Sequence, residues 1–159
     1  MTYRIGQGFD VHGYEAGKPL RLGGLTIPNE PGLKGHSDGD VILHALCDAL
    51  LGAAGLGDIG EHYPDTDNIY KQYDSQLFLS DTLTKVRLSG YKIVNLDVTV
   101  IAQKPKLGTL KSDIRHHLAK IVQLDPKLVN IKATTTDGFG FIGREEAMAA
   151  MVVVLLELS

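Results

Sequence analysis

The sequence has a single cysteine, no long apolar segment and no excess of positive charge, and each of these absences excludes a class of protein. Cys47 alone cannot form an internal disulfide, which predicts a reducing, cytoplasmic setting. The longest apolar stretch, residues 147–156, is about half the roughly 20 residues of a membrane-spanning helix, and the first residues form no secretory apolar segment. The net charge of −3 argues against a nucleic-acid or anionic membrane surface. We therefore expect neither nucleic acid nor membrane as a partner.

The hydrophobic pattern of the 159 residues predicts one domain, 1–159, in which strands alternate with helices. We expect strands over 3–11, 91–103, 129–136 and 148–158, helices over 37–53, 74–88 and 110–122, a hairpin arm over 20–27, a turn over 28–32 and a loop over 55–67. This order favours an α/β fold of the two-layer α+β kind, a mixed β-sheet with helices packed on one face.

Three residues form a candidate metal site. Asp10 and His12 are two apart in a predicted strand, so their side chains lie on the same face. His44, on the predicted helix from Ser37, offers a third ligand, and Asp48 one turn later is placed to orient its imidazole. One carboxylate and two imidazoles are typical of a catalytic rather than a structural zinc site, because three protein ligands leave the fourth coordination position of the ion open. The alternative is that both histidines are hydrogen-bonded core residues.

The loop before this helix, residues 34–40, has the features of an anion site. Ser37 and Asp40 resemble a capping box, and free backbone N–H groups at a helix N-terminus attract phosphate. His36 is not explained by capping. Capping and phosphate contact are compatible, so both interpretations of Ser37 stand.

Two further segments carry polar groups. Residues 57–67 are rich in carboxylates and glycines, which suits either a polyol-binding loop or a solvated turn. Thr134, Thr135 and Thr136 with Asp137 end a predicted strand, and three successive side chains in a strand alternate between faces, so one of them faces a ligand or the less favoured side. Residues 103–108 form a second loop at a strand end, with basic groups.

Together these motifs resemble the 2-C-methyl-D-erythritol 2,4-cyclodiphosphate synthase family. The resemblance runs in order along essentially the whole chain and rests on the segments Gly8-Phe9-Asp10-Val11-His12, His36-Ser37-Asp38-Gly39-Asp40-Val41 through His44, Gly57-Asp58-Ile59-Gly60, Tyr63-Pro64-Asp65-Thr66-Asp67, Ala102-Gln103-Lys104-Pro105-Lys106 and Lys132-Ala133-Thr134-Thr135-Thr136. So many motifs in order are far more specific than the three metal ligands alone.

The resemblance implies a homotrimer in the non-mevalonate isoprenoid pathway, with active sites at subunit boundaries. The substrate would be the cytidine diphosphate-linked 4-diphosphocytidyl-2-C-methyl-D-erythritol 2-phosphate, cyclised by a phosphorus–oxygen lyase with release of CMP. Zn²⁺ would be held by Asp10, His12 and His44, and Mg²⁺ or Mn²⁺ by Asp137 with the substrate diphosphate. His36 and Thr135 would stabilise the transition state. The implied substrate-binding residues are Asp10, His12, His36, Ser37, Asp58, Ile59, Gly60, Tyr63, Pro64, Asp65, Thr66, Asp67, Ala102, Gln103, Lys104, Pro105, Lys106, Leu107, Gly108, Ala133, Thr134, Thr135, Thr136, Asp137, Phe141 and Arg144.

Three positions depart from the family pattern. Asp137 stands where many relatives have glutamate, Gln7 where histidine is common, and Glu145 where glycine is frequent. By the same resemblance, Phe9, Phe141 and Arg144 would allow an isoprenoid diphosphate to bind in a central trimer cavity. Two other functions remain as alternatives: a zinc phosphoesterase that hydrolyses its substrate with metal-bound water, and a non-enzymatic trimer that binds isoprenoid diphosphates.

Overall fold

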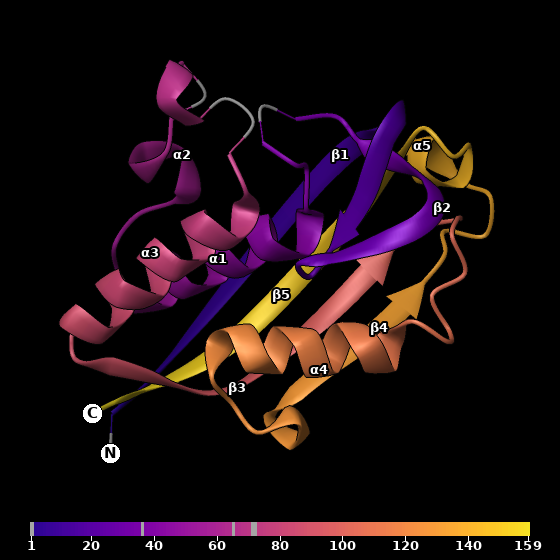
Figure 1. The fold of residues 1–159 in the computed structure, drawn as a ribbon. Helices are drawn as coiled ribbons and strands as arrows, with labels where there is room; N and C mark the ends of the chain where they lie inside the picture. Colours follow the sequence, from indigo (N-terminus) through magenta and orange to yellow (C-terminus); the bar gives the residue numbers. More distant parts are fainter. Residues whose placement is uncertain (1, 36, 65, 71–72) are drawn as a thin grey trace.

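The computed structural model describes residues 2–35, 37–64, 66–70 and 73–159, which fold around a mixed five-stranded sheet (Figure 1). The strand order is β2-β1-β5-β3-β4; β3 and β4 run parallel, and the other neighbouring pairs are antiparallel. The strands are β1 (Tyr3–Leu22), β2 (Leu25–Leu33), β3 (Tyr91–Ile101), β4 (Val129–Thr134) and β5 (Ala147–Leu158). The helices are α1 (Val41–Ala54), α2 (Ile59–His62), α3 (Ser75–Leu88), α4 (Lys111–Val122) and α5 (Gly140–Gly143), with short 3₁₀ turns η1 (Asn68–Tyr70) and η2 (Pro126–Leu128).

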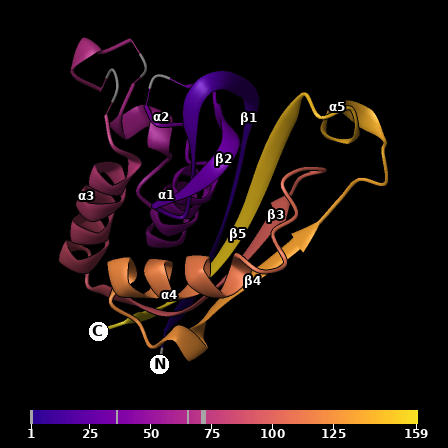
Figure 2. The same ribbon diagram turned by 45° about the vertical axis from the view of Figure 1, so that its right-hand side comes forward.

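Three helices, α1, α3 and α4, lie on one side of this sheet, as Figure 2 shows. Leu46 and Leu50 of α1 are fully buried, as are Val152 and Val154 of the central strand β5. Such a layer of helices on one sheet face buries the apolar side of both elements. The expected fold, a mixed sheet with helices on one face, is confirmed.

Helix α1 lies unusually close to β1 because two glycines of the strand face it. A Cβ atom on Gly6 would come within 2.0 Å of the Ala49 carbonyl oxygen, and one on Gly8 within 1.9 Å of the Ala45 carbonyl oxygen. Glycine within a strand often marks such a close approach of another backbone. The same face of β1 continues to Asp10. The two glycines therefore bring the helix backbone next to the strand that carries the predicted metal ligands.

The opposite face of the sheet is apolar and uncovered in the single chain. Ile5, Phe9 and Val11 of β1 and Met151 and Val153 of β5 are exposed, and Phe9 pairs with Met151 in the antiparallel register. An apolar patch that extends over neighbouring strands is a common mark of a protein–protein interface. We call this surface the open sheet face.

Most element boundaries were predicted within a few residues, but the first strand was expected to end at residue 11 and runs to Leu22, and the start of α1 was placed too early. Asp40 is the N-cap: its Oδ1 accepts the N–H groups of Ile42 and Leu43 at 3.1 Å. Its carboxylate also accepts the N–H groups of Gly23 and Gly24, at 2.9 and 2.7 Å. The proposed capping box from Ser37 was therefore wrong, because the buried Asp40 caps the helix and fastens the β1–β2 turn to it.

The hairpin was also misplaced. Leu20 pairs with Ile27 and Leu22 with Leu25, so 20–27 is the turn region itself rather than one arm. Residues 28–32, expected as a turn, continue β2, where Pro31 pairs with Pro19 beside register shifts. The segment 55–67, expected as a loop, contains the helical turn α2. No helix in the described ranges is both long and apolar enough to pass through a membrane.

Candidate metal centre and substrate pockets

Asp10, His12 and His44 meet where α1 crosses β1, as the sequence predicted. Asp10 Oδ2 lies 2.9 Å from His12 Nε2 and 3.1 Å from His44 Nδ1. The two histidine nitrogens are 3.1 Å apart. The side chains come from two rigid elements, and in the described part of the chain they form a group of three possible ligands with all ligand atoms within 4.8 Å of one another.

The spacing of these atoms fits a zinc ion. Zinc bound to nitrogen at 2.0–2.1 Å in a tetrahedron places neighbouring ligand atoms about 3.3 Å apart. The three observed separations are only slightly shorter than that edge. One carboxylate oxygen and two imidazole nitrogens are also donors that zinc accepts in catalytic sites, where a fourth position stays open.

The protonation of the ligand group follows from its contacts. Burial would raise the pKa of Asp10, but hydrogen bonds from His12 and His44 outweigh it and hold that pKa well below its ordinary value. Burial would likewise lower the pKa of His12, yet the hydrogen bond to Asp10 leaves that pKa raised. The carboxylate is therefore ionised at neutral pH, and a cation entering the group competes with protons on the imidazoles.

The second ring nitrogen of His44 faces two serines. His44 Nε2 lies 2.9 Å from Ser75 Oγ and 3.1 Å from Ser37 Oγ. The expectation that Asp48 orients this ring is wrong, because Asp48 Oδ1 instead accepts the N–H of Ile59 at 2.7 Å and fastens α2 to α1. Sequence reasoning missed Ser75, which lies 31 positions from His44 and carries no local signal of this contact.

The ligand group lies in the wall of a cavity of about 500 Å³, here called the metal-site pocket. Of the residues predicted to bind metal or substrate, the cavity brings together Asp10, His12, Ser37, His44, Ile59, Gly60, Tyr63, Pro64 and Thr66. It also includes Gly35, Tyr70 and Phe78, which the sequence analysis did not select. Phe78 packs against Tyr63 with ring centroids 4.8 Å apart, so an aromatic wall faces the metal ligands.

A second cavity of about 300 Å³, the strand-end pocket, lies where β3 and β4 end. It gathers the predicted residues Ala102, Pro105, Lys106, Leu107, Gly108, Ala133, Thr134 and Thr135. Val100 and Lys111 also line it and were not predicted; Lys111 is the first residue of α4, which only the fold places beside the β4 end. The metal-site pocket and the strand-end pocket have no lining residue in common.

The remaining predicted residues line neither pocket. Asp58 and Asp67 accept backbone N–H groups of Glu61 and Ile69, as ordinary turn carboxylates do. Asp137 adopts a positive φ of 52° and accepts a 3.3 Å hydrogen bond from the Thr135 hydroxyl. The others in the described ranges are Gln103, Lys104, Thr136, Phe141 and Arg144. His36 and Asp65 lie outside the described residues.

Comparison with known proteins adds an independent line of evidence. A family model described as the YgbB family matches residues 3–157. A 2-C-methyl-D-erythritol 2,4-cyclodiphosphate synthase from Desulfatibacillum aliphaticivorans is 55% identical over 154 residues, covering 97% of this chain and 99% of that protein. The bifunctional IspDF from Campylobacter jejuni has a TM-score of 0.95 and 47% identity over 99% of this chain, which spans 43% of that one. Plasmodium falciparum IspF, solved as a CDP complex, has a TM-score of 0.87 and 33% identity, with coverage of 99% and 97%.

Proposed function

The chain belongs to the YgbB family of 2-C-methyl-D-erythritol 2,4-cyclodiphosphate synthases, and from this premise we propose how its two pockets carry out the cyclisation. The substrate is 4-diphosphocytidyl-2-C-methyl-D-erythritol 2-phosphate. An oxygen of its 2-phosphate forms a bond to the β-phosphorus, and the bond from that phosphorus to the oxygen of CMP breaks. The products are 2-C-methyl-D-erythritol 2,4-cyclodiphosphate and CMP. The reaction belongs to isoprenoid biosynthesis by the non-mevalonate route.

The observation that carries this proposal is the ligand group in the wall of the metal-site pocket. Asp10, His12 and His44 would hold Zn²⁺, because their donor atoms and spacings suit that ion. The bound ion would supply positive charge next to a phosphate oxygen and so reduce the repulsion between the two phosphates. A phosphate monoester is mostly ionised near neutral pH, so the chain does not have to provide a general base.

The protein's own groups would bind and orient the folded substrate. His36, Ser37 and the backbone before α1 would contact phosphate oxygens, and Asp58, Gly60 and Asp65 would bind the methylerythritol hydroxyls. Thr135 would contact phosphate from the strand-end pocket, whose remaining predicted residues would surround the cytidine. Lys106 and Lys111 line that pocket and give local positive charge in a chain of net charge −3. Holding both phosphates in line converts their reaction into an oriented intramolecular step.

We propose a homotrimer whose active sites each combine the metal-site pocket of one subunit with the strand-end pocket of the next. Two observations support this arrangement. The described residues place the two pockets in separate cavities of one chain. The open sheet face exposes Ile5, Phe9 and Val153, which burial against other subunits would remove from water.

Asp137 would help to place Mg²⁺ or Mn²⁺ on the substrate diphosphate. It offers one exposed carboxylate next to Thr135. Magnesium is usually bound by one or two carboxylates together with substrate phosphates and water, so a single protein ligand is sufficient.

Product analysis tests the proposed reaction. The protein with Zn²⁺ and Mg²⁺ is incubated with the substrate, and ³¹P NMR is expected to show CMP and one product that retains both remaining phosphates. A zinc phosphoesterase would release inorganic phosphate instead. A non-enzymatic diphosphate-binding trimer would give no turnover. Either result would overturn the proposal.

An isoprenoid diphosphate in a central trimer cavity is a separate proposal. Phe9 on the open sheet face and Phe141 on α5 are partly exposed apolar groups suited to an isoprenoid chain. Arg144 is exposed but its guanidinium is engaged by Glu146 at 2.7 Å. Titration of the trimer with geranyl diphosphate tests it: saturable binding is expected, and its absence rejects the proposal.

A further inference from the structure

A chain of hydrogen bonds runs from His44 Nε2, the ring nitrogen not directed at Asp10, through Ser75 to the carboxylate of Asp38. Ser75 is fully buried, and its hydroxyl donates to Asp38 Oδ1. The backbone N–H of Ser75 donates to Asp38 Oδ2 at 3.2 Å. An ionised carboxylate can only accept hydrogen bonds, so both Ser75 protons point toward Asp38.

These hydrogen bonds determine that Nε2 of His44 carries a hydrogen. Because the Ser75 hydroxyl proton is directed to Asp38, Ser75 Oγ can only accept at its 2.9 Å contact with His44 Nε2. His44 Nε2 therefore carries the hydrogen. With Nε2 protonated, Nδ1 is the ring nitrogen that can bind a cation, and it is the atom that lies 3.1 Å from Asp10 Oδ2 and from His12 Nε2.

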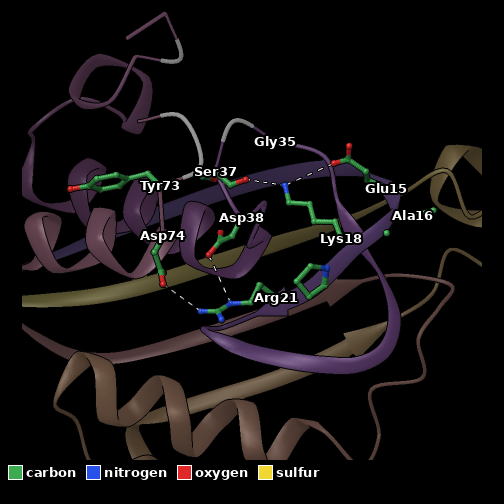
Figure 3. Close-up of a pocket in the computed structure, with 11 residues that line it drawn as sticks. Glu15, Ala16, Lys18, Arg21, Gly35, Ser37, Asp38, Tyr73 and Asp74 are labelled. Atoms are coloured by element: carbon green, nitrogen blue, oxygen red, sulfur yellow. Dashed lines mark hydrogen bonds and ion pairs between the residues drawn. The ribbon is translucent and has the colours of Figure 1, made fainter. Parts of the chain in front are cut away.

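Two basic residues, Arg21 and Lys18, contact the loop that carries Asp38. A groove of about 680 Å³ lies beside this loop. In Figure 3, Arg21 is directed toward Asp38 and Asp74, and Lys18 toward Ser37. Arg21 Nε lies 3.9 Å from Asp38 Oδ2, and Lys18 Nζ donates to the Ser37 carbonyl oxygen at 2.9 Å. Arg21 also pairs with Asp74 at 3.6 Å, so these cations support the loop that carries Asp38.

The contact is not needed to cap α3. Asp74 is the N-cap of that helix, and its Oδ1 accepts the N–H of Gln76 at 2.8 Å. The Ser75 hydroxyl instead connects α3 to a ligand on α1, across 31 positions of sequence. Its geometry is that of a group that orients a metal-binding imidazole through the second ring nitrogen.

We propose that Ser75 and Asp38 are positioning residues: Ser75, whose hydroxyl donates to Asp38, accepts the Nε2–H of His44 and so orients its ring with Nδ1 directed at the cation site, and Arg21 keeps Asp38 in place. The inference rests on the proposed metal site for its role in catalysis. The hydrogen bond from His44 Nε2 to Ser75 is itself a property of the metal-free protein.

Removal of the Ser75 hydroxyl is the first test. Ser75→Ala is expected to weaken Zn²⁺ binding about 10- to 100-fold, measured by competition with a chromophoric chelator. Asp74→Ala is the matched control, because it removes the cap of the same helix and one partner of Arg21 but leaves the contacts of His44 intact. It is expected to lower the melting temperature with unchanged Zn²⁺ affinity. Equal losses of affinity in the two variants would show a merely structural role and overturn the proposal.

Asp38→Asn tests the direction of the hydrogen bonds at nearly constant volume. Its NH₂ group is better placed at Oδ1, because at Oδ2 it would meet two donors, the Ser75 N–H and Arg21. The Ser75 hydroxyl then becomes an acceptor from the amide and donates to His44 Nε2, which shifts the imidazole toward the Nδ1–H tautomer. The variant is expected to bind Zn²⁺ more weakly while remaining folded, although the Asp40 N–H also loses an acceptor at Oδ1.

Imidazole ¹⁵N NMR of the metal-free protein reads the tautomer directly. His44 Nε2 is expected to carry a hydrogen in the wild type and to be mainly unprotonated in the Asp38→Asn variant. The same protonation of Nε2 in both proteins would overturn the proposal, and this measurement remains possible if Ser75→Ala fails to fold. If the wild type binds no Zn²⁺ but Nε2 behaves as expected, the metal assignment fails and the positioning of His44 stands.

Discussion

The metal-site pocket and the strand-end pocket differ in how completely one chain builds them. The first is formed by a strand and a helix pressed together through Gly6 and Gly8, and its ligand atoms already lie about 3 Å apart. The second lies where β3 and β4 end, in loops with Lys106 and Lys111 at its rim. A preorganised group of ligands suits a small ion. Loops suit a larger ligand, whose binding site another subunit would complete. In the proposed trimer, one half of the site is therefore fixed by the fold of a single chain and the other half depends on assembly.

The sharpest test of the fixed half is His44→Ala. We expect kcat/KM to fall on the order of 1,000-fold, because the cation that neutralises phosphate charge is lost. Gel filtration is expected to show an intact trimer, since His44 lies at the pocket and not on the open sheet face. His116→Ala, on the exposed side of α4, is the control and should retain full activity. Unfolding of the His44 variant would instead make the metal structural.

Assembly is tested by placing a charge on the open sheet face. Val153→Asp is expected to convert the trimer to monomers and to lower activity at least about 10-fold, because burying an unpaired carboxylate costs several kcal/mol. Light scattering measures the mass. Leu88→Asp is the matched control: Leu88 is 84% exposed at the end of α3, away from that face, and the change should leave the trimer intact. A fully active Val153 monomer would mean that one chain completes its own site.

Mixed trimers test directly whether the two pockets work across subunits. His44→Ala damages the metal-site pocket, and Lys106→Glu damages the strand-end pocket. Refolding them together in equal amounts is expected to restore about one quarter of wild-type activity, because a quarter of the boundaries combine two intact halves. Each variant refolded alone provides the baseline. If both halves come from one chain, the mixture stays inactive.

The smallest effect concerns the carboxylate that fastens α2 to α1. Burial raises the pKa of Asp48. The folded protein then binds a proton more tightly than the unfolded chain, so Asp48 costs stability above its ordinary pKa. Asp48→Asn keeps the acceptor for the Ile59 N–H and is expected to stabilise the metal-free protein by less than about 1 kcal/mol at pH 7, a figure reduced by solvent screening. Urea unfolding at pH 7 and pH 3 measures it. If Asp48→Asn raises the free energy of unfolding at pH 3 as well, the electrostatic explanation is contradicted.

The two pockets also differ in how far the sequence predicted them. Asp10 and His12 were placed on one strand face by their spacing, and their 2.9 Å approach confirms it. Lys111 was not predicted, because its place beside Thr134 depends on how α4 returns along β4. Phe78 was not predicted either, because a helix expected over 74–88 does not show which of its side chains face the metal ligands. The spacing placed Asp48 on the same helix face as His44, yet its carboxylate accepts the backbone N–H of Ile59 in α2 instead.

The sequence by itself determined most of the helices and strands, the same-face pair of Asp10 and His12, and the family, because these depend on local periodicity and on motifs read in order. The tertiary structure alone decided the central position of β5, the close approach of α1 over Gly6 and Gly8, and the contact of Ser75 with His44. The physical reason is that strand order and helix packing bring together residues far apart in the chain. No local sequence pattern predicts which of those residues will be in contact.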